Sequence, residues 1–208
     1  MIVKSIVVEC PNCQLEIKAS KWPYTAGKFG TYTDMKVKGR IPCNPPIIRC
    51  KRCNYIFYDK NLELDKNLLQ TYLKNEEYKK LVTSEEKVFL VIYEIYKKLS
   101  LPLNVQNKAL LHNYYASRDL EDLKLLTCGY EQFLDSNGDI DKEFIFAKIM
   151  TGEFYRRSGS FRKAKIIFEE IVNLKQSNEL NLIDMCNFQL ELIEQQDTKL
   201  MKCEMLHK

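Results

Sequence analysis

The sequence predicts a mainly α fold, in which a small N-terminal β module precedes an all-α helical domain. All prolines except Pro102 lie within the first 60 residues, together with the single tryptophan and short β-type runs. Beyond Leu62, apolar residues recur at helical spacing. This change places the boundary after residue 60, giving a module over 1–60 and a helical domain over 61–208.

The elements follow from local patterns. Two short strands are expected at Ile6-Val7-Val8 and Tyr55-Ile56-Phe57-Tyr58. A first helix follows from the apolar stripe Leu64, Leu68, Leu69, Tyr72 and Leu73. A capping box at Thr83-Ser84-Glu85-Glu86 predicts the start of a second helix, which Pro102 ends. Further helices are expected at about 105–117, 120–134, 142–157, 161–174 and 179–195.

The hydropathy of the chain favours the cytoplasm. No run approaches the roughly 18 apolar residues that a membrane span requires. The first eight residues are too short an apolar run for a signal peptide. Because cytoplasmic thiols stay reduced, paired cysteines are expected to be metal ligands and not disulfides.

Two CxxC pairs predict a metal site. Cys10-Pro11-Asn12-Cys13 and Cys50-Lys51-Arg52-Cys53 each follow or precede a predicted strand, as the hooks of zinc ribbons do. Each hook directs two sulfurs at one point, and two hooks close a tetrahedral four-sulfur site. The sequence therefore predicts a structural zinc ion bound by Cys10, Cys13, Cys50 and Cys53, with the charges of Lys51 and Arg52 offsetting those of the thiolates.

Other interpretations of these cysteines remain open. The same four sulfurs suit iron, as in rubredoxin. A thioredoxin-like redox role for the first pair requires a βαβ context, and the residues after Cys13 do not form a long helix. Catalytic zinc is disfavoured because four cysteines leave no open position. Cys43 is either a loop cysteine near the site or an additional ligand, whereas Cys128 and Cys186 are expected to be buried small hydrophobes.

The stretch 148–171 predicts one tetratricopeptide-like (TPR-like) helix pair. Gly152 and Ala164 are the small positions where two helices approach, Gly159 makes the turn, and Phe161 and Phe168 fill the space between them. The helix at 179–195 would cap the pair. Arg156-Arg157 and Arg162-Lys163 could bind an acidic partner or form a solvated face.

Several signals do not lead to chemistry. The polar stretch from Asp135 to Asp141 resembles a calcium loop, but Ile140 occupies the required glycine position and Phe146 the position of the bidentate glutamate. His112 and His207, the only histidines, have no evident catalytic partner. We therefore expect no enzymatic activity and infer no small-molecule substrate.

The order of these motifs resembles a bacterial family catalogued as domain of unknown function 2225. The matching segments are Cys10-Pro11-Asn12-Cys13, Gly27-Lys28-Phe29, Asp34, Asn44-Pro45-Pro46, Cys50 to Tyr55, and Tyr155 to Ala164. The chain departs from that family at Asn54, where glycine is usual, and in having only Asp34 where paired acids are common. The resemblance implies a zinc-ribbon-like head on TPR-like helices and no established activity.

These observations predict a non-enzymatic zinc-binding adaptor that contacts another protein through its helices, without a membrane partner. The alternative is nucleic-acid binding by the head, where basic residues outnumber acidic ones by 11 to 4 over residues 1–60. Stacking would then fall to the aromatics of the head, namely Trp22, Tyr24, Phe29, Tyr32 and Tyr55.

Overall fold

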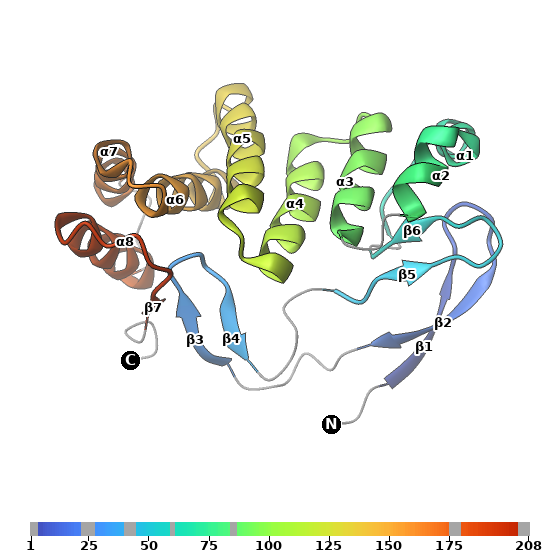
Figure 1. Cartoon of the computed structure of the whole chain (residues 1–208), viewed down its shortest axis with the longest axis horizontal. Helices are drawn as coiled ribbons and strands as arrows, with labels where there is room; N and C mark the ends of the chain where they lie inside the picture. Colours follow the sequence, from blue (N-terminus) through green and yellow to red (C-terminus); the bar gives the residue numbers. More distant parts are fainter. Residues whose placement is uncertain are drawn as a thin grey trace. The chain divides into compact units, whose positions relative to one another are not determined.

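The computed structural model describes residues 4–21, 28–39, 45–58, 61–83, 87–174 and 180–203. Within these residues the chain is mainly helical, with short antiparallel β hairpins ahead of the helices, which confirms the predicted fold class (Figure 1). The chain divides into two compact units, each assembled from two stretches of sequence. Unit 1 comprises Met1–Ala26 and Asn44–Ala116, and unit 2 comprises Gly27–Cys43 and Ser117–Lys208. These borders differ from the predicted division after residue 60.

The β part of unit 1 consists of two antiparallel hairpins, each of which encloses one CxxC pair. β1 (Lys4–Glu9) pairs with β2 (Glu16–Lys21), and β5 (Ile48–Arg49) pairs with β6 (Ile56–Phe57). Side chains alternate between the two faces of a strand. In β1, Val8 is therefore buried at 2% exposure while its neighbour Val7 is 60% exposed.

The helices of unit 1 begin with two short helices, of which the apolar stripe indicated only the first. α1 (Lys66–Lys74) lies where the first helix was predicted, and after Asn75 it is followed by α2 (Glu76–Thr83), a helix that was not predicted. The backbone of Asn75 is extended, and its side chain accepts a hydrogen bond from the N–H of Glu77, 3.1 Å away. Asn75 therefore ends one helix and caps the next.

Two further helices complete unit 1: α3 (Val88–Lys98) and α4 (Leu103–Ser117), whose last residue falls at the border with unit 2. The predicted capping box is wrong at Thr83, which ends α2 and does not open the next helix. Its remaining residues, 84–86, lie outside the described part of the chain.

In the part of unit 1 that the structure describes, the cysteine hooks and the helices share a hydrophobic core. Cys10, Cys50, Tyr55 and Phe57 are fully buried in the same cluster as residues of all four helices, including Leu69, Tyr78, Ile92 and Ala109. The short hairpin β5–β6 lies beside α3 (Figure 1). The compact unit therefore extends to residue 116, because the apolar side of the head is covered by α1–α4.

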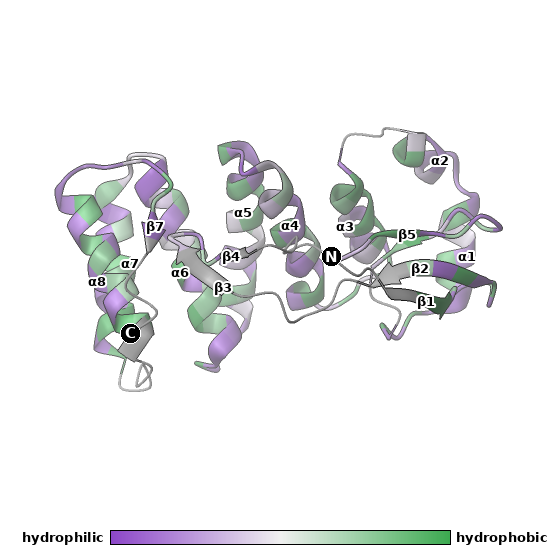
Figure 2. Ribbon diagram, turned by 90° about the horizontal axis from the view of Figure 1, so that it is seen from below, coloured by the Kyte–Doolittle hydropathy of each residue, from purple (hydrophilic) through white to green (hydrophobic). Residues whose placement is uncertain are grey.

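Unit 2 contains the remaining helices, which match their predicted ranges to within two residues: α5 (Leu120–Ser136), α6 (Lys142–Arg157), α7 (Phe161–Asn173) and α8 (Leu180–Glu194). Hydrophobic and hydrophilic residues interleave along α7 and α8, as expected for helices buried on one side (Figure 2). The side chain of Asp141 caps α6 by accepting a hydrogen bond from the N–H of Phe144 at 2.7 Å.

The α6–α7 hairpin packs as the small residues predicted. A methyl group added at Gly152 would lie 2.8 Å from Cζ of Phe168, so only glycine permits this approach. Ala164 and Phe168 are fully buried, and Gly159 turns the chain with a φ of 77°. Tyr155 also makes a contact outside the hairpin, because its hydroxyl donates to Glu131 of α5 at 2.6 Å.

Unit 2 also contains a small antiparallel sheet that the prediction of an all-α domain lacked. Its strand order is β4 (Val37–Gly39), β3 (Lys28–Tyr32), β7 (Lys202–Cys203). β3 and β4 come from the segment between the two CxxC pairs, whereas β7 follows α8 by several residues. The sheet therefore joins parts of the sequence that are far apart (Figure 1).

A buried hydrogen-bond network attaches this sheet to the helices. Glu153 of α6 is fully buried and accepts hydrogen bonds from Thr33, after β3, at 2.8 Å and from Gln189 of α8 at 2.9 Å. Gln189 also donates to the carbonyl oxygen of Thr33 at 3.1 Å. Burial raises the pKa of Glu153, opposed first by the charge of Arg156 and then by these bonds.

Arg156 lies at the centre of the same network, with no exposed side-chain surface. Its guanidinium pairs with Glu153 at 2.9 Å, and it donates to Gln189 and to the carbonyl oxygens of Asp197 and Lys199. The sequence-based alternatives for Arg156, a partner contact or a solvated face, are therefore both wrong. The guanidinium is paired and hydrogen-bonded inside unit 2, where it holds the segment that leads to β7.

Within the described residues, no helix is both long enough and apolar enough to cross a membrane.

Candidate metal centre

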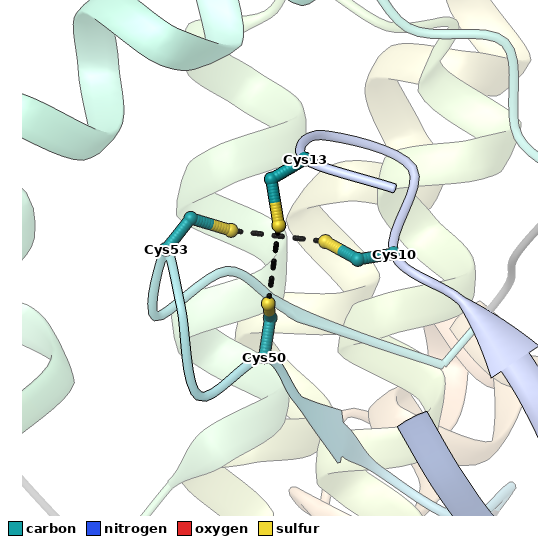
Figure 3. A group of neighbouring side chains, drawn as sticks. All are labelled: Cys10, Cys13, Cys50 and Cys53. Carbon is teal, nitrogen blue, oxygen red and sulfur yellow. Dashed lines mark hydrogen bonds between the residues drawn. The ribbon is translucent and has the colours of Figure 1, made fainter. Parts of the chain in front are cut away.

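The first hook is a tight turn that begins where β1 ends. The N–H of Cys10 donates to the carbonyl oxygen of Leu15 at 2.9 Å, and the N–H of Gln14 donates back to the carbonyl oxygen of Cys10 at 2.9 Å. Closing this turn forces Gln14 to a φ of 60°. The geometry brings the side chains of Cys10 and Cys13 to the same side of the turn (Figure 3).

The second hook repeats the first, bond for bond. Cys50 donates to Tyr55 and Asn54 donates to Cys50, both at 2.9 Å, and Asn54 has a φ of 57°. Asparagine tolerates the left-handed conformation better than most residues. Asn54 therefore fits the position where the resembled family has glycine.

The two hooks direct their four sulfurs at one centre (Figure 3). Cys10 Sγ lies 3.7 Å from Cys53 Sγ, Cys13 Sγ lies 3.4 Å from Cys50 Sγ, and all four lie within 4.8 Å of one another. Zn–S bonds of about 2.3 Å in a tetrahedron place neighbouring sulfurs roughly 3.8 Å apart. Disulfide sulfurs would be about 2.0 Å apart, and all four cysteines are free. The cluster is therefore compatible with a metal ion bound by four thiolates.

Burial and backbone N–H groups tune the thiols differently. Cys10 and Cys50 are fully buried, whereas Cys13 and Cys53 are partly exposed. Burial raises the pKa of the Cys10 and Cys53 thiols. At Cys50 burial acts in the same direction, but hydrogen bonds from the backbone of Cys53 and Arg52 lower the pKa to about 7. Loading the site with a metal must therefore release protons.

Polar groups around the hooks fix their positions. Arg52 in the second hook donates from Nη1 to the carbonyl oxygen of Cys13 at 3.3 Å, which ties one hook to the other. The side-chain amide of Asn12 bonds to Cys53 and lowers its pKa, in opposition to burial. The hydroxyl of Tyr78 in α2 donates to the carbonyl oxygen of Asn54 at 2.7 Å. Such outer contacts orient the groups that hold a metal.

The chemistry of the donor set decides what the centre can do. Four sulfurs complete a tetrahedron and leave no position for water or substrate, so a bound ion would be structural. Soft thiolates favour zinc and iron over magnesium and calcium. The cluster therefore fits the predicted ion and equally the iron alternative.

The other cysteines and histidines contribute nothing to this centre where they are described. Cys128 is exposed, against the expectation of burial, while Cys186 is fully buried as expected. His112 packs beside the rings of Tyr58 and Phe89, with ring centroids 5.1 and 5.4 Å away. Cys43 and His207 lie outside the described residues, so the role of Cys43 stays a prediction.

The aromatics proposed for nucleic-acid stacking are not free platforms where they are described. Tyr55 is fully buried and stacks on Phe57, with ring centroids 5.2 Å apart. One face of the half-buried Tyr32 ring is occupied by the guanidinium of Arg118, whose central carbon lies 4.0 Å from the ring centroid. Trp22 and Tyr24 lie outside the described residues, as does the side chain of Phe29.

Sequence reasoning missed Glu153, Gln189, Thr33 and Arg118 as residues that hold unit 2 together. The i, i+3 spacing of Glu153 and Arg156 signals an ion pair on a helix, but not that the pair is buried. Asp34, matched to the family only as an acidic residue, is fully buried and faces Arg118, with Oδ2 and Nη2 3.7 Å apart.

No protein-family model matches the chain, and no curated protein or solved structure matches it either. The resemblance to the family of domain of unknown function 2225 therefore stays a prediction.

Proposed function

We propose that the chain is a non-enzymatic adaptor, in which a zinc ion bound by Cys10, Cys13, Cys50 and Cys53 holds the head together. The observation that carries the zinc site is the convergence of four sulfurs from two matching hooks. Zinc suits this role because it is redox-inert and accepts tetrahedral thiolate coordination. A reducing cytoplasm, the location we propose, would keep the thiols available.

Protein binding is the second part of the proposal. Its support is the α6–α7 hairpin, in which Gly152, Ala164, Gly159 and Phe168 occupy the positions expected of a TPR-like unit. Stacked helix pairs of that kind present side chains for protein recognition. Ile166 of α7 and Leu125 of α5 are 50% and 38% exposed, which offers apolar contacts on the surface of unit 2. The hook-and-helix order also supports membership of the resembled family.

Nucleic-acid binding, the alternative expectation, gains no support from the described aromatics. Tyr55 has no accessible face, and the guanidinium of Arg118 occupies one face of Tyr32. Since no observation favours it, we retain nucleic acid only as an outcome of the tests.

Metal analysis tests the zinc proposal. Protein purified under reducing conditions without added metal is expected to contain one zinc ion per chain by mass spectrometry of the elements. Cys50→Ser should lose the ion, whereas Cys128→Ser, the matched control at an exposed cysteine, should keep it. Visible absorbance together with stoichiometric iron would show that the bound metal is iron and not zinc. No stoichiometric metal in the wild type would sink the site.

Affinity purification after crosslinking in native cells tests the adaptor proposal. The wild-type bait is expected to retain a protein partner after nuclease treatment, and Ile166→Lys should weaken that retention while keeping the metal content unchanged. Glu169→Gln, a control at another exposed position of the same helix, should not. If nuclease treatment dissociates the complex, or if the bait captures no protein, the adaptor proposal is wrong.

A further inference from the structure

A groove of about 510 Å³ opens beside the first hook of unit 1. One wall comes from the end of β1 and the first hook, where Glu9, Pro11 and Gln14 line it. The other wall is the segment 62–66, which leads into α1. The volume lies in the range of sites that enclose a few side chains of a ligand.

The backbone along this groove has unused hydrogen-bonding capacity. Between Asn61 and Asp65 the chain is neither helix nor strand, and within the described residues the peptide groups of Leu62, Glu63 and Leu64 make no hydrogen bond. On the other wall, the groove meets β1 only at its last residue, Glu9. Unpaired peptide groups are what an added extended peptide requires.

The side chains of the groove combine an apolar wall with negative groups at its edge. Leu62 and Leu64 are half-buried against the core of unit 1 and also line the groove. Glu9 and Glu63 are exposed at its edge, opposed by one ammonium group, that of Lys66. The fully buried Cys10 borders the same space. Four thiolates around a divalent ion keep a net charge of about −2, which Lys51 and Arg52 of the second hook offset in part. The field in the groove therefore favours a cation beside apolar groups.

We propose that this groove binds an extended segment of a partner protein, in which basic residues alternate with apolar ones. The apolar side chains would contact Leu62 and Leu64, and the basic ones Glu9 and Glu63. The proposal rests on the proposed function, because the bound ion supplies part of the negative charge. It assigns peptide recognition to the metal-holding head, separately from the helices of unit 2.

Selection from a phage-displayed library of random nine-residue peptides tests this assignment. The bait is the full chain with its zinc content measured. Enriched peptides are expected to alternate basic with apolar residues. On the wild type they should shift amide resonances of residues 9–15 and 61–66, and bind the double variant Glu9→Gln, Glu63→Gln roughly tenfold more weakly. Glu121→Gln, Glu191→Gln, which removes two exposed carboxylates of unit 2, should leave their affinity unchanged.

The outcomes separate this inference from the function on which it rests. Peptides without basic residues, peptides that ignore the Glu9 and Glu63 substitutions, or no enrichment at all on a zinc-loaded bait would overturn the groove assignment and leave the zinc proposal standing. A bait without a stoichiometric metal would remove both.

Discussion

The two units solve the same problem with different chemistry. Each must hold together segments that are far apart in sequence. Unit 1 does so with four sulfurs around one centre, contributed by hooks whose first cysteines are fully buried. Unit 2 does so with the guanidinium of Arg156, which bonds to Glu153, to Gln189 and to two backbone carbonyl groups.

This difference determines what each unit depends on. A thiolate centre gains its stability from an ion outside the chain, with apparent values of roughly 10–16 kcal/mol in zinc-finger peptides, and is sensitive to pH and chelators. A buried ion pair needs no external component, but it tolerates no missing member, because an unpaired buried charge is costly. Breaking each in turn should therefore affect one unit at a time.

The largest effect is expected from Cys50→Ser. Loss of the ion should destabilise unit 1 by several kcal/mol, since the hooks then no longer close. Hydrogen exchange should show opening of β5, β6 and α1–α3, with α5–α8 much less affected. Cys128→Ser is the control, and equal protection of unit 1 in both variants would contradict a stabilising ion.

The next effect is expected from Arg156→Met, which leaves the carboxylate of Glu153 buried without its cation. We expect a loss of about 3–5 kcal/mol in the free energy of unfolding, measured by denaturant titration of unit 2 signals. Arg162→Met on the exposed side of α7 should stay within about 0.5 kcal/mol. Adding Glu153→Gln to Arg156→Met should recover part of the loss. If the double variant instead loses the sum of the two single-variant losses, the two residues do not form a coupled network.

Acid should weaken unit 1 through His112. Burial first, and then the charge of Lys108, lower its pKa to about 4 from the usual 6.5. The unfolded chain therefore binds a proton that the folded chain refuses, so stability is lost as the pH falls from 6.5 towards 4, at no more than about 1.4 kcal/mol per pH unit. His112→Phe should flatten this slope in thermal melts. If the wild type and His112→Phe lose stability equally with falling pH at the same metal content, His112 is not the group responsible.

A smaller effect is expected from Gly152→Ala. The added methyl group would lie 2.8 Å from Phe168 and force α6 and α7 apart, for about 1–3 kcal/mol. Gly138→Ala is the matched control, since nothing lies within 4 Å of its added methyl group. Phe168→Leu should relieve part of the loss. Unchanged melting temperatures in both glycine variants would show that the hairpin is looser than described.

The smallest effect is expected at the hooks themselves. Gln14 adopts a φ of 60°, which favours glycine, so Gln14→Gly should stabilise unit 1 by about 0.5–1 kcal/mol. Asn54→Gly should gain less, because asparagine already tolerates this conformation. In competition with a chelator, both glycine variants should lose their metal more slowly than the wild type. A destabilised Gln14→Gly variant would mean that its side chain matters more than its backbone.

Local patterns were enough to predict most of this molecule. The hooks follow from CxxC spacing and the left-handed position after it, and α4–α8 follow from apolar periodicity within single segments. α2 was harder, because the apolar stripe ends at Leu73 and only the side-chain bond of Asn75 to the N–H of Glu77 marks the start of a new helix.

The long-range contacts could not be predicted in this way. Thr33 and Glu153 are 120 residues apart in sequence, and Thr33 and Gln189 are 156 apart. No local pattern distinguishes the buried Arg156 from its neighbour Arg157, since both are basic and adjacent on one helix. Their difference arises only when β3, α8 and the segment before β7 come together around one of them.

The hairpin β3–β4 also limits how this protein can be divided. It is encoded between the two hooks yet belongs to unit 2, so the polypeptide passes from one unit to the other three times. A gene fragment for residues 117–208 would lack Thr33 and leave Glu153 short of a donor, while a fragment ending at 116 would carry an orphaned hairpin. No single cut of the chain therefore yields both units intact, so the two cannot be expressed separately as contiguous fragments.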